Sequence, residues 1–181
     1  HAARARGFRR DRRQAGQILS QKLANYHGDK KALVLGLPRC GVVVAEEVAR
    51  ALSVPLDVIL LRKLPYPPQR ELAVGAVAED GSTFINAEFR DAVKEQPGWL
   101  EPIIREQIEV IRTRAKLYRP HRHAHGYQGK TVILVDDGIA TGATMKVAVR
   151  AARSGGAARV IVAIPVAAPS SVRELRTEAD E

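Results

Sequence analysis

Short apolar runs alternate with stretches of helical periodicity along most of the chain. Runs rich in valine, isoleucine and leucine occupy residues 32–35, 56–61, 131–135 and 160–166. Apolar runs of this length are typical of strands that are buried on both faces of a parallel sheet. Between them, apolar side chains recur at helical spacing over residues 43–52, before Pro55, and over residues 142–152. The pattern predicts an α/β fold with a doubly wound, mainly parallel sheet flanked by helices.

The middle of the chain interrupts this alternation. Residues 62–71 carry three prolines within four positions, which predicts a long cationic loop instead of regular structure. Residues 72–78 and 83–85 lie on either side of an Asp-Gly turn, which predicts a β-hairpin. The loop and the hairpin would together form an insertion in the sheet fold.

Two further helices are predicted from periodicity and capping residues. Apolar residues along one stripe predict a long amphipathic helix over residues 100–115, which Pro120 ends. Near the end of the chain, Pro169-Ser170-Ser171 opens another helix. Ser170 is its predicted N-cap, because a serine hydroxyl can accept a hydrogen bond from the first helical turn.

The positive charge is concentrated at the start of the chain. The 181 residues carry 29 Lys and Arg against 20 Asp and Glu, a net charge of +9, and residues 1–13 account for +5 of it. This predicts a basic N-terminal arm over residues 1–13 and one globular domain over residues 14–181. The remaining charge is ordinary for a domain that handles anionic ligands. We interpret the arm as solvated, and the alternative is that it seeks phosphate groups.

Composition narrows the class of protein. Hydrophobic residues make up 45% of the chain, which is enough for a packed core. No apolar run approaches 18 residues, so neither a membrane span nor a membrane partner is expected. The one cysteine, Cys40, cannot form a disulfide within the chain, which fits a cytoplasmic location. The chain starts without methionine or an apolar leader, so we expect a segment of a longer protein.

The most informative stretch is residues 132–144. Four apolar residues lead directly to Asp136 and Asp137, whose adjacent carboxylates can accept hydrogen bonds from the vicinal hydroxyls of a sugar. Thr141-Gly142-Ala143-Thr144 then opens a helix, where free backbone N–H groups and two hydroxyls can converge on an anion. A diol acceptor followed by a phosphate cradle suits ribose 5-phosphate. A helix cap followed by a turn would explain an isolated acid pair, but not this ordered combination.

This stretch resembles the phosphoribosyl pyrophosphate (PRPP) motif of the type I phosphoribosyltransferases. That motif is a hydrophobic run, two acids, three variable residues and Thr-Gly-x-Thr. The resemblance implies the fold of that family, with a hairpin and mobile-loop insertion. It also implies that Asp136 and Asp137 hold the ribose hydroxyls. The 5-phosphate would be held by residues Ala140, Thr141, Gly142, Ala143 and Thr144.

A second segment, residues 36–41, agrees with the first. Gly36-Leu37-Pro38-Arg39-Cys40-Gly41 links the first strand to its helix, and it is not a P-loop because Val42-Val43 follows where Lys-Ser/Thr is required. In the phosphoribosyltransferase fold this is the position of the pyrophosphate loop, so the contacts are expected from Pro38, Arg39, Cys40 and Gly41. The run also resembles a group of uncharacterised bacterial predicted phosphoribosyltransferases that have glycine at position 40. If that position needs a positive φ, Cys40 would strain the loop.

The cations of the proline-rich loop have two interpretations. The loop is either a solvated surface segment or the mobile loop of the family, which closes over PRPP and excludes water. In the second case, Arg62 and Lys63 would contact pyrophosphate. Lys63 is the stronger candidate because it directly follows a predicted strand, and Arg70 is a weaker one.

The resemblance also implies a reaction. PRPP would bind with Mg²⁺, and an acceptor, expected to be a nucleobase, would displace pyrophosphate at C1 in a step of nucleotide metabolism. Asp136, Asp137, Arg39 and Lys63 form the expected catalytic set. Magnesium would be held through PRPP, with Asp136 and Asp137 as the candidate protein ligands. Ala140 stands where the hypoxanthine-guanine enzymes have an acid, which argues against the 6-oxopurine subclass.

Other functions compatible with the same motifs remain open. The chain could be a PRPP-sensing regulatory module whose basic arm binds nucleic acid, although nucleic acid is not the expected partner. It could also contribute only to assembly within a fusion protein. Phosphoribosyltransferases recognise the acceptor with a hood subdomain, and the sequence to Glu181 supplies no C-terminal hood. We therefore expect the domain to be truncated at that end. Separately, a homodimer is the expected assembly.

Overall fold

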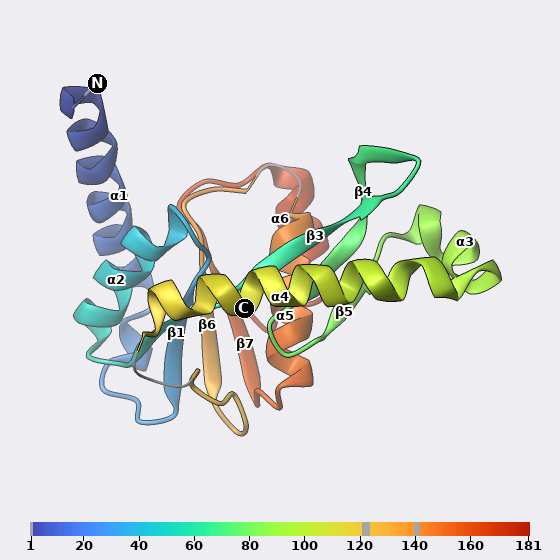
Figure 1. Ribbon diagram of the computed structural model, residues 1–181. Coiled ribbons are helices and arrows are strands. Elements are labelled where there is room, and N and C mark those ends of the chain that lie inside the picture. Colours follow the sequence, from blue (N-terminus) through green and yellow to red (C-terminus); the bar gives the residue numbers. More distant parts are fainter. Residues whose placement is uncertain (1, 121–123, 140–141) are drawn as a thin grey trace. The chain divides into compact units, whose positions relative to one another are not determined.

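The computed structural model describes residues 2–120, 124–139 and 142–181 (Figure 1). The chain forms two compact units. The first, here called the sheet unit, comprises His1–Ile59 and His125–Glu181. The second, the hairpin unit, comprises Leu60–Ala124. None of the described helices is long and apolar enough to cross a membrane.

The sheet unit contains four parallel strands. They are β1 (Ala32–Gly36), β2 (Leu56–Val58), β6 (Thr131–Val135) and β7 (Arg159–Ala163), in the order β2-β1-β6-β7. All residues of β1 and residues 132–135 of β6 are buried, as the unbroken apolar runs predict. The predicted parallel α/β fold is thus confirmed. The chain leaves β1 toward β2 on one side and later returns to β6 on the other, so the strand order reverses between β1 and β6.

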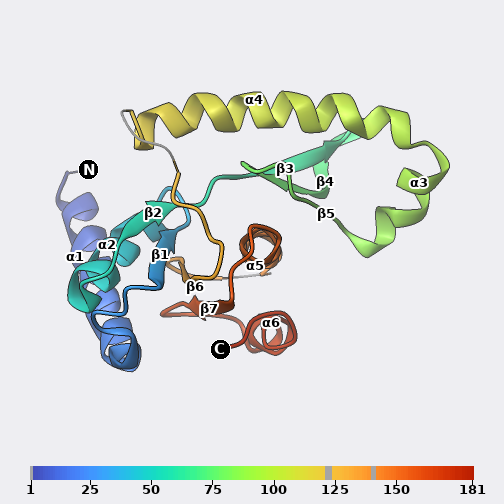
Figure 2. The ribbon, with the colours of Figure 1, turned by 90° about the horizontal axis from the view of Figure 1, so that it is seen from below.

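Helices cover both faces of this sheet. Figure 2 shows α1 (Ala2–Lys22) and α2 (Gly41–Leu52) on one face and α5 (Ala143–Ser154) on the other. Leu19 of α1, Leu23 just after it and Val48 of α2 pack with Val34 and Ile133 in the main hydrophobic cluster. Helix α1 is continued by η1 (Ala24–Tyr26). The predicted boundary after residue 13 falls within α1.

The last two predicted elements of the sheet unit differ in detail. Strand β7 ends at Ala163, earlier than the expected residue 166, and an isolated bridge joins Ile139 to Ala167. Helix α6 (Pro169–Leu175) is capped by Ala168, so the expected Ser170 cap is wrong. Ala168 has the extended backbone of an N-cap, and Pro169 occupies the first helical position, where its missing N–H costs nothing.

The hairpin unit contains an antiparallel sheet of three strands, β3 (Leu61–Tyr66), β4 (Gln69–Ala78) and β5 (Thr83–Ile85), in the order β3-β4-β5. The β4–β5 hairpin was predicted. The expected loop over residues 62–71 is wrong, because most of it belongs to β3 and β4. Pro67 and Pro68 form the turn between the strands, and Pro65 pairs with Ala73 between two shifts of register. Proline is tolerated at such turns and irregularities.

Helices complete the hairpin unit. They are η2 (Ala87–Phe89), α3 (Arg90–Glu95), η3 (Pro97–Trp99) and α4 (Leu100–Tyr118), and α4 confirms the predicted long helix. The Tyr66 ring lies 5.2 Å from that of Phe89 and 6.0 Å from that of Trp99, centroid to centroid. After α4, the buried Arg119 guanidinium donates from Nη1 to Glu79 Oε1 at 3.1 Å.

Candidate functional site

The two sequence motifs meet at the carboxyl ends of β1 and β6. Leu37 N–H donates to the Val135 carbonyl at 2.9 Å, which extends the contact between the strands into the loop after β1. Gly41, the first residue of α2, lies directly against the start of the acid pair. A Cβ at Gly41 would lie 2.8 Å from Asp136 Oδ1 and 2.9 Å from the Val135 carbonyl oxygen. Only glycine permits this approach, which occurs at the topological switch point where ligands bind in such sheets.

The loop between β1 and α2 carries one cationic side chain, that of Arg39. Leu37 is buried, Pro38 is half-buried, and Arg39 and Cys40 are exposed. The peptide bond between Pro38 and Arg39 is cis. Cys40 has a φ of −78°, in the right-handed helical region, so the backbone strain considered for a cysteine at this position does not occur. Because Arg39 is exposed and the first N–H groups of a helix have no partner within the helix, the loop can offer the Arg39 guanidinium and the amides at the start of α2 to an anion.

The acid pair follows β6, and both side chains are half-buried. The Asp137 N–H donates to Asp136 Oδ1 at 2.8 Å. Burial raises the pKa of Asp136 to about 6, and the neighbouring Asp137 carboxylate acts in the same direction, whereas the hydrogen bond from the Asp137 N–H opposes it. Two adjacent carboxylates at the end of a buried strand can accept hydrogen bonds from two neighbouring hydroxyl groups.

Asp137 has a partner that sequence analysis missed. Arg12 of α1 donates from Nε to Asp137 Oδ2 at 2.9 Å. The Arg12 side chain is 26% exposed, which differs from the solvated state expected for the basic arm. The arginine-rich composition signals a basic start, but no motif marks Arg12 among the other arginines.

A small pocket lies between the acid pair and the beginning of α5. Its volume is about 120 Å³, and it is lined by Asp136, Gly138, Ile139, Gly142, Ala143, Thr144 and Met145. Gly142 has a φ of +73°, which favours glycine at the point where the chain turns into α5. Of the five residues predicted to hold a phosphate, Gly142, Ala143 and Thr144 line this pocket, while Ala140 and Thr141 lie outside the described residues.

Backbone hydrogen bonds hold the wall of this pocket. Ile139 N–H donates to the Val166 carbonyl at 3.0 Å, and Ala168 N–H donates to the Ile139 carbonyl at 3.2 Å. A Cβ at Gly142 would lie 3.4 Å from the Cβ of Ser171 on α6. The segment that leads into α6 therefore contacts the chain at Ile139 and at Gly142.

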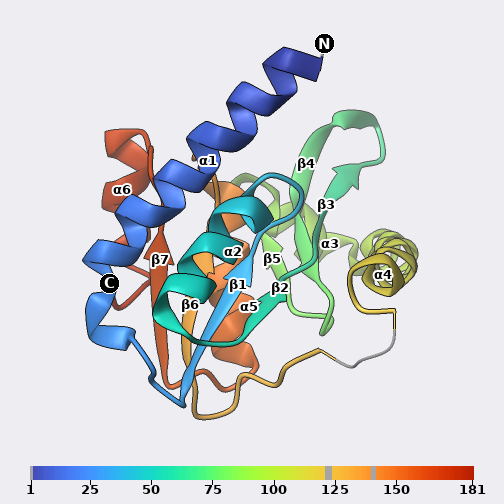
Figure 3. The same cartoon turned by 90° about the vertical axis from the view of Figure 1, so that its left-hand side faces the viewer.

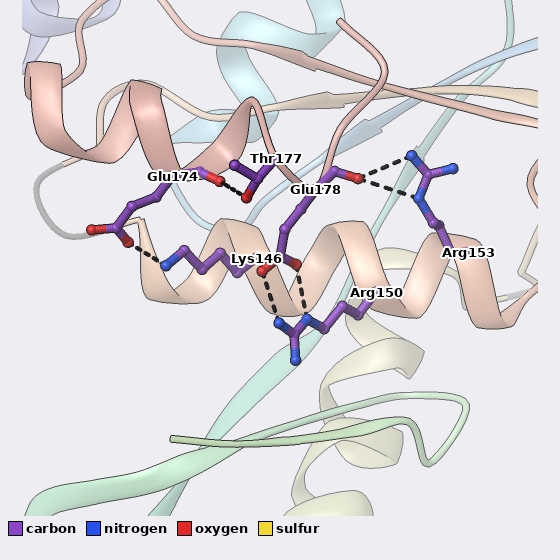
Figure 4. A network of polar contacts seen from close by, with 6 residues as sticks. All are labelled: Lys146, Arg150, Arg153, Glu174, Thr177 and Glu178. Carbon is purple, nitrogen blue, oxygen red and sulfur yellow. Dashed lines mark hydrogen bonds and ion pairs between the residues drawn. The ribbon is translucent and has the colours of Figure 1, made fainter. Parts of the chain in front are cut away.

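Ion pairs connect α5 with the α6 region (Figure 4). Arg150 donates to both carboxylate oxygens of Glu178, from Nε at 2.8 Å and from Nη2 at 2.7 Å. Arg153 donates to the Glu178 carbonyl, and Lys146 pairs with Glu174. The hydrogen bond from Arg150 lowers the pKa of Glu178. These contacts hold α5 against the segment that borders Gly142.

The predicted cations Arg62 and Lys63 lie on β3 in the hairpin unit. Arg62 donates from Nε to Oε1 of the buried Gln107 on α4 at 3.0 Å. Lys63 is exposed, as expected where successive side chains of a strand alternate between faces. Arg62 therefore connects β3 to α4, and the pyrophosphate contacts expected of both residues stay predictions.

Comparisons with known proteins identify the family. The family model described as "Phosphoribosyl transferase domain" matches residues 11–181. Two curated Mycobacterium tuberculosis proteins, from strains CDC 1551 and H37Rv, bear the name "putative phosphoribosyl transferase". Each is 42% identical to this chain over 171 residues, which cover 94% of the chain and 38% of the relative. The chain thus spans well under half the length of these relatives.

Solved structures agree with this assignment. The structure of the protein TT1426 from Thermus thermophilus is 44% identical, with a TM-score of 0.78, and the match covers 93% of this chain and 79% of that one. A purine phosphoribosyltransferase from Pyrococcus horikoshii shares the fold at 20% identity, with a TM-score of 0.50 and coverage of 86% and 72%. The family match over residues 11–181 agrees with the strand order and with the two motif loops. The chain belongs to the phosphoribosyl transferase domain family.

Proposed function

We propose that this domain transfers the ribose 5-phosphate group of PRPP to an acceptor and releases pyrophosphate. The contact between Gly41 and Asp136 carries the proposal, because it brings the loop with Arg39 and the acid pair together at the switch point of the sheet. A ligand bound there could have its pyrophosphate on the loop and its ribose on the acids. Membership of the family supports the same activity.

The ribose 5-phosphate half of PRPP fits the β6–α5 segment. Asp136 and Asp137 would accept hydrogen bonds from the ribose hydroxyls, and the pocket lined by Gly142, Ala143 and Thr144 would hold the 5-phosphate. The beginning of α5 provides backbone N–H groups and the positive end of a helix dipole, both of which favour a phosphate. The predicted contributions of Ala140 and Thr141 belong to the same subsite.

Magnesium would bind at the acid pair together with PRPP. Two half-buried carboxylates next to an arginine-bearing loop fit Mg²⁺, which binds proteins through one or two carboxylates plus substrate phosphate oxygens. Asp136 and Asp137 are the residues that would hold it. The ion would supply charge neutralisation for the departing pyrophosphate.

The protein's part in the reaction is positioning and charge stabilisation. The bond between C1 and pyrophosphate breaks, its electron pair leaves with pyrophosphate, and the acceptor forms the new bond at C1. Arg39 would neutralise negative charge on the leaving group, and the acids would fix the ribose ring. Lys63 remains the candidate for a second cation on pyrophosphate.

We propose a nucleobase as the acceptor, other than a 6-oxopurine because Ala140 replaces the acid of that subclass. Such a reaction belongs to nucleotide metabolism, and we place it in the cytoplasm, where a single cysteine remains reduced. A homodimer of the domain is part of the same proposal. The regulatory alternative, a PRPP sensor, would bind PRPP without releasing pyrophosphate.

The decisive experiment follows pyrophosphate release by the full-length natural chain from Mg·PRPP with a panel of nucleobases. We expect release with at least one base, and loss of release and of PRPP binding in the double variant Asp136→Asn with Asp137→Asn. Asp91→Asn, an exposed acid on α3, is the matched control. PRPP binding without release for any base would favour the sensor. Unchanged PRPP binding by the double variant would contradict the ribose assignment.

A further inference from the structure

The N-terminal helix contributes a side chain to the acid pair. Arg12 Nε donates to Asp137 Oδ2 at 2.9 Å across 125 residues of sequence. Both side chains are largely shielded, with exposed fractions of 26% for Arg12 and 29% for Asp137. We propose that Arg12 is a positioning residue of the ribose subsite, which holds the Asp137 carboxylate in the orientation that receives a ribose hydroxyl. This inference rests on the proposed function.

Helix α1 lies alongside α2 (Figure 3) and packs closely against it at Gly16. A Cβ at Gly16 would lie 2.6 Å from the Cβ of Glu47 and 2.9 Å from the Val44 carbonyl oxygen, both on α2. Gly16 follows Arg12 by four residues, so both lie on the same face of α1. The glycine therefore allows the approach of the two helices that brings Arg12 toward the acid pair.

Charged side chains reinforce this contact between the two helices. Glu47 is only 4% exposed, and its carboxylate pairs with Arg50 of its own helix and with Arg13 of α1 at 3.7 Å. Leu19 of α1 and Leu23, which directly follows the helix, are buried in the main hydrophobic cluster. Apolar burial and an ion pair thus set the position of α1, so the contact of Arg12 with Asp137 does not depend on a freely moving arm.

Helix α2 contacts both the acid pair and helix α1. Its first residue, Gly41, lies against Asp136, and its next turns cross α1 at Gly16. Helix α2 is therefore a rigid connection between the pyrophosphate loop, the acid pair and the helix that carries Arg12. Displacement of α1 would remove Arg12 from the ribose subsite without altering the pyrophosphate loop itself.

The contact with Arg12 has a definite chemical consequence for Asp137. A charge-assisted hydrogen bond to Oδ2 fixes the plane of the carboxylate and leaves Oδ1 to accept from a ligand hydroxyl. Asp136 already accepts the Asp137 N–H through its own Oδ1. The guanidinium also offsets the repulsion between two adjacent carboxylates. A ligand with ribose hydroxyls should therefore depend on Arg12, whereas pyrophosphate alone should not.

The test compares three ligands and four forms of the full-length natural chain by calorimetric titration. The ligands are Mg·PRPP, ribose 5-phosphate and metal-free pyrophosphate. The proteins are the wild type, Arg12→Gln, Arg12→Lys and Lys22→Gln, which removes one charge from an exposed position of the same helix. Thermal melting of each variant checks that the fold is retained.

We expect Arg12→Gln to weaken binding of PRPP and ribose 5-phosphate by about tenfold or more, the equivalent of one charge-assisted hydrogen bond. Pyrophosphate binding and the Lys22→Gln control should stay at the wild-type level. Arg12→Lys should recover part of the loss, because lysine retains the charge but not the planar guanidinium. Equal losses for ribose 5-phosphate and pyrophosphate would overturn the proposal, and so would ribose 5-phosphate affinity that is unchanged or tighter in Arg12→Gln. The tighter result would mean that Arg12 blocks the subsite.

A double-mutant cycle tests whether Arg12 and Asp137 affect ribose 5-phosphate affinity together or independently. If Arg12 acts through Asp137, Arg12→Gln should weaken ribose 5-phosphate binding much less in the Asp137→Asn background than in the wild type. Full additivity would overturn the proposal. Failure of the wild-type protein to bind PRPP would instead contradict the proposed function, so the two failures are distinguishable.

Discussion

Gly41 and Asp136 lie so close together that the glycine has no room for a side chain. A Cβ at Gly41 would approach Asp136 Oδ1 to 2.8 Å and the Asp136 Cα to 2.9 Å. Two loops separated by nearly a hundred residues thus meet at this contact, beside the hydrogen bond from Leu37 N–H to the Val135 carbonyl. In a chain that belongs to the phosphoribosyl transferase domain family, the same contact sets how far the proposed pyrophosphate and ribose subsites lie apart.

Gly41→Ala should therefore damage both stability and PRPP binding. Because the obstructing atoms include backbone, the helix start or the acid pair must shift, at a cost of about 1–3 kcal/mol in the free energy of unfolding. Urea denaturation and PRPP titration measure the two effects. Gly126→Ala is the control, because a Cβ there meets nothing within 4 Å. Wild-type PRPP affinity in Gly41→Ala would show that the spacing of the loops does not matter for binding.

Asp136 should make PRPP binding sensitive to mild acid. Burial raises the pKa of its carboxyl to about 6, and only the ionised carboxylate accepts hydrogen bonds with both oxygens. Affinity for Mg·PRPP should therefore fall as the pH drops from 7 to 5. Titration at fixed ionic strength measures this profile, with metal-free pyrophosphate as a reference ligand that needs neither the hydroxyl acceptor nor the proposed metal ligand.

The same raised pKa has the opposite effect on folding stability. Because the folded protein holds the Asp136 proton more tightly than the unfolded chain, the protonated form contributes stability that is fully present below pH 3.8. That contribution should be lost as the pH rises through about 6. Asp136→Asn should remove this part of the pH dependence in urea denaturation. An unchanged profile in that variant would mean that another group titrates in this window.

Much of the sheet unit follows from local patterns in the sequence. Each of the four apolar runs contains a parallel strand, and the glycines of both motifs lie where the backbone needs them. The run over residues 56–61 predicts a single strand, but β2 ends at Val58 and Leu61 begins β3 of the hairpin unit. Predictions based on single residue types were less successful. Prolines 65, 67 and 68 indicated a loop, yet a turn and two register shifts accommodate them between β3 and β4. Serine is a favoured N-cap residue, but the extended backbone that an N-cap requires occurs at Ala168 and not at Ser170.

Arg12 illustrates the part of the site that sequence patterns could not provide. Its contact with Asp137 spans 125 residues and depends on the crossing of α1 and α2. That crossing depends on Gly16, which carries no chemical signal when viewed alone in an arginine-rich helix. The strand-end acids could be predicted because strand, acids and helix are consecutive, whereas a contribution from tertiary packing requires the structure.

The Arg150–Glu178 pair should contribute modestly to stability. Its bidentate geometry is favourable, but the Arg150 side chain is 42% exposed, so solvent screening reduces the coupling to about 0.5–1 kcal/mol. A double-mutant cycle with Arg150→Gln and Glu178→Gln measures this value by urea denaturation. Arg173→Gln, at an exposed position of α6, controls for loss of charge.

The pH dependence of that pair should run opposite to that of Asp136. The hydrogen bond from Arg150 lowers the pKa of Glu178 below its ordinary value of 4.5. The folded state therefore binds this proton less tightly than the unfolded chain, and the stabilisation is present above pH 4.5 and lost as the pH falls through the folded pKa. Arg150→Gln should lose less stability on acidification than the wild type does. A larger loss would show that the contact does not stabilise the carboxylate.

Gly16→Ala should connect helix packing to the ribose subsite. The new Cβ would lie 2.6 Å from the Glu47 Cβ and 2.9 Å from the Val44 carbonyl oxygen, so α1 must move away from α2, at a cost of about 1–3 kcal/mol. If Arg12 orients Asp137, ribose 5-phosphate binding should weaken in this variant while pyrophosphate binding is preserved. Gln17→Ala, an exposed neighbour on α1, should change neither affinity. A destabilised Gly16→Ala protein with wild-type affinity for ribose 5-phosphate would show that the position of α1 matters only for stability.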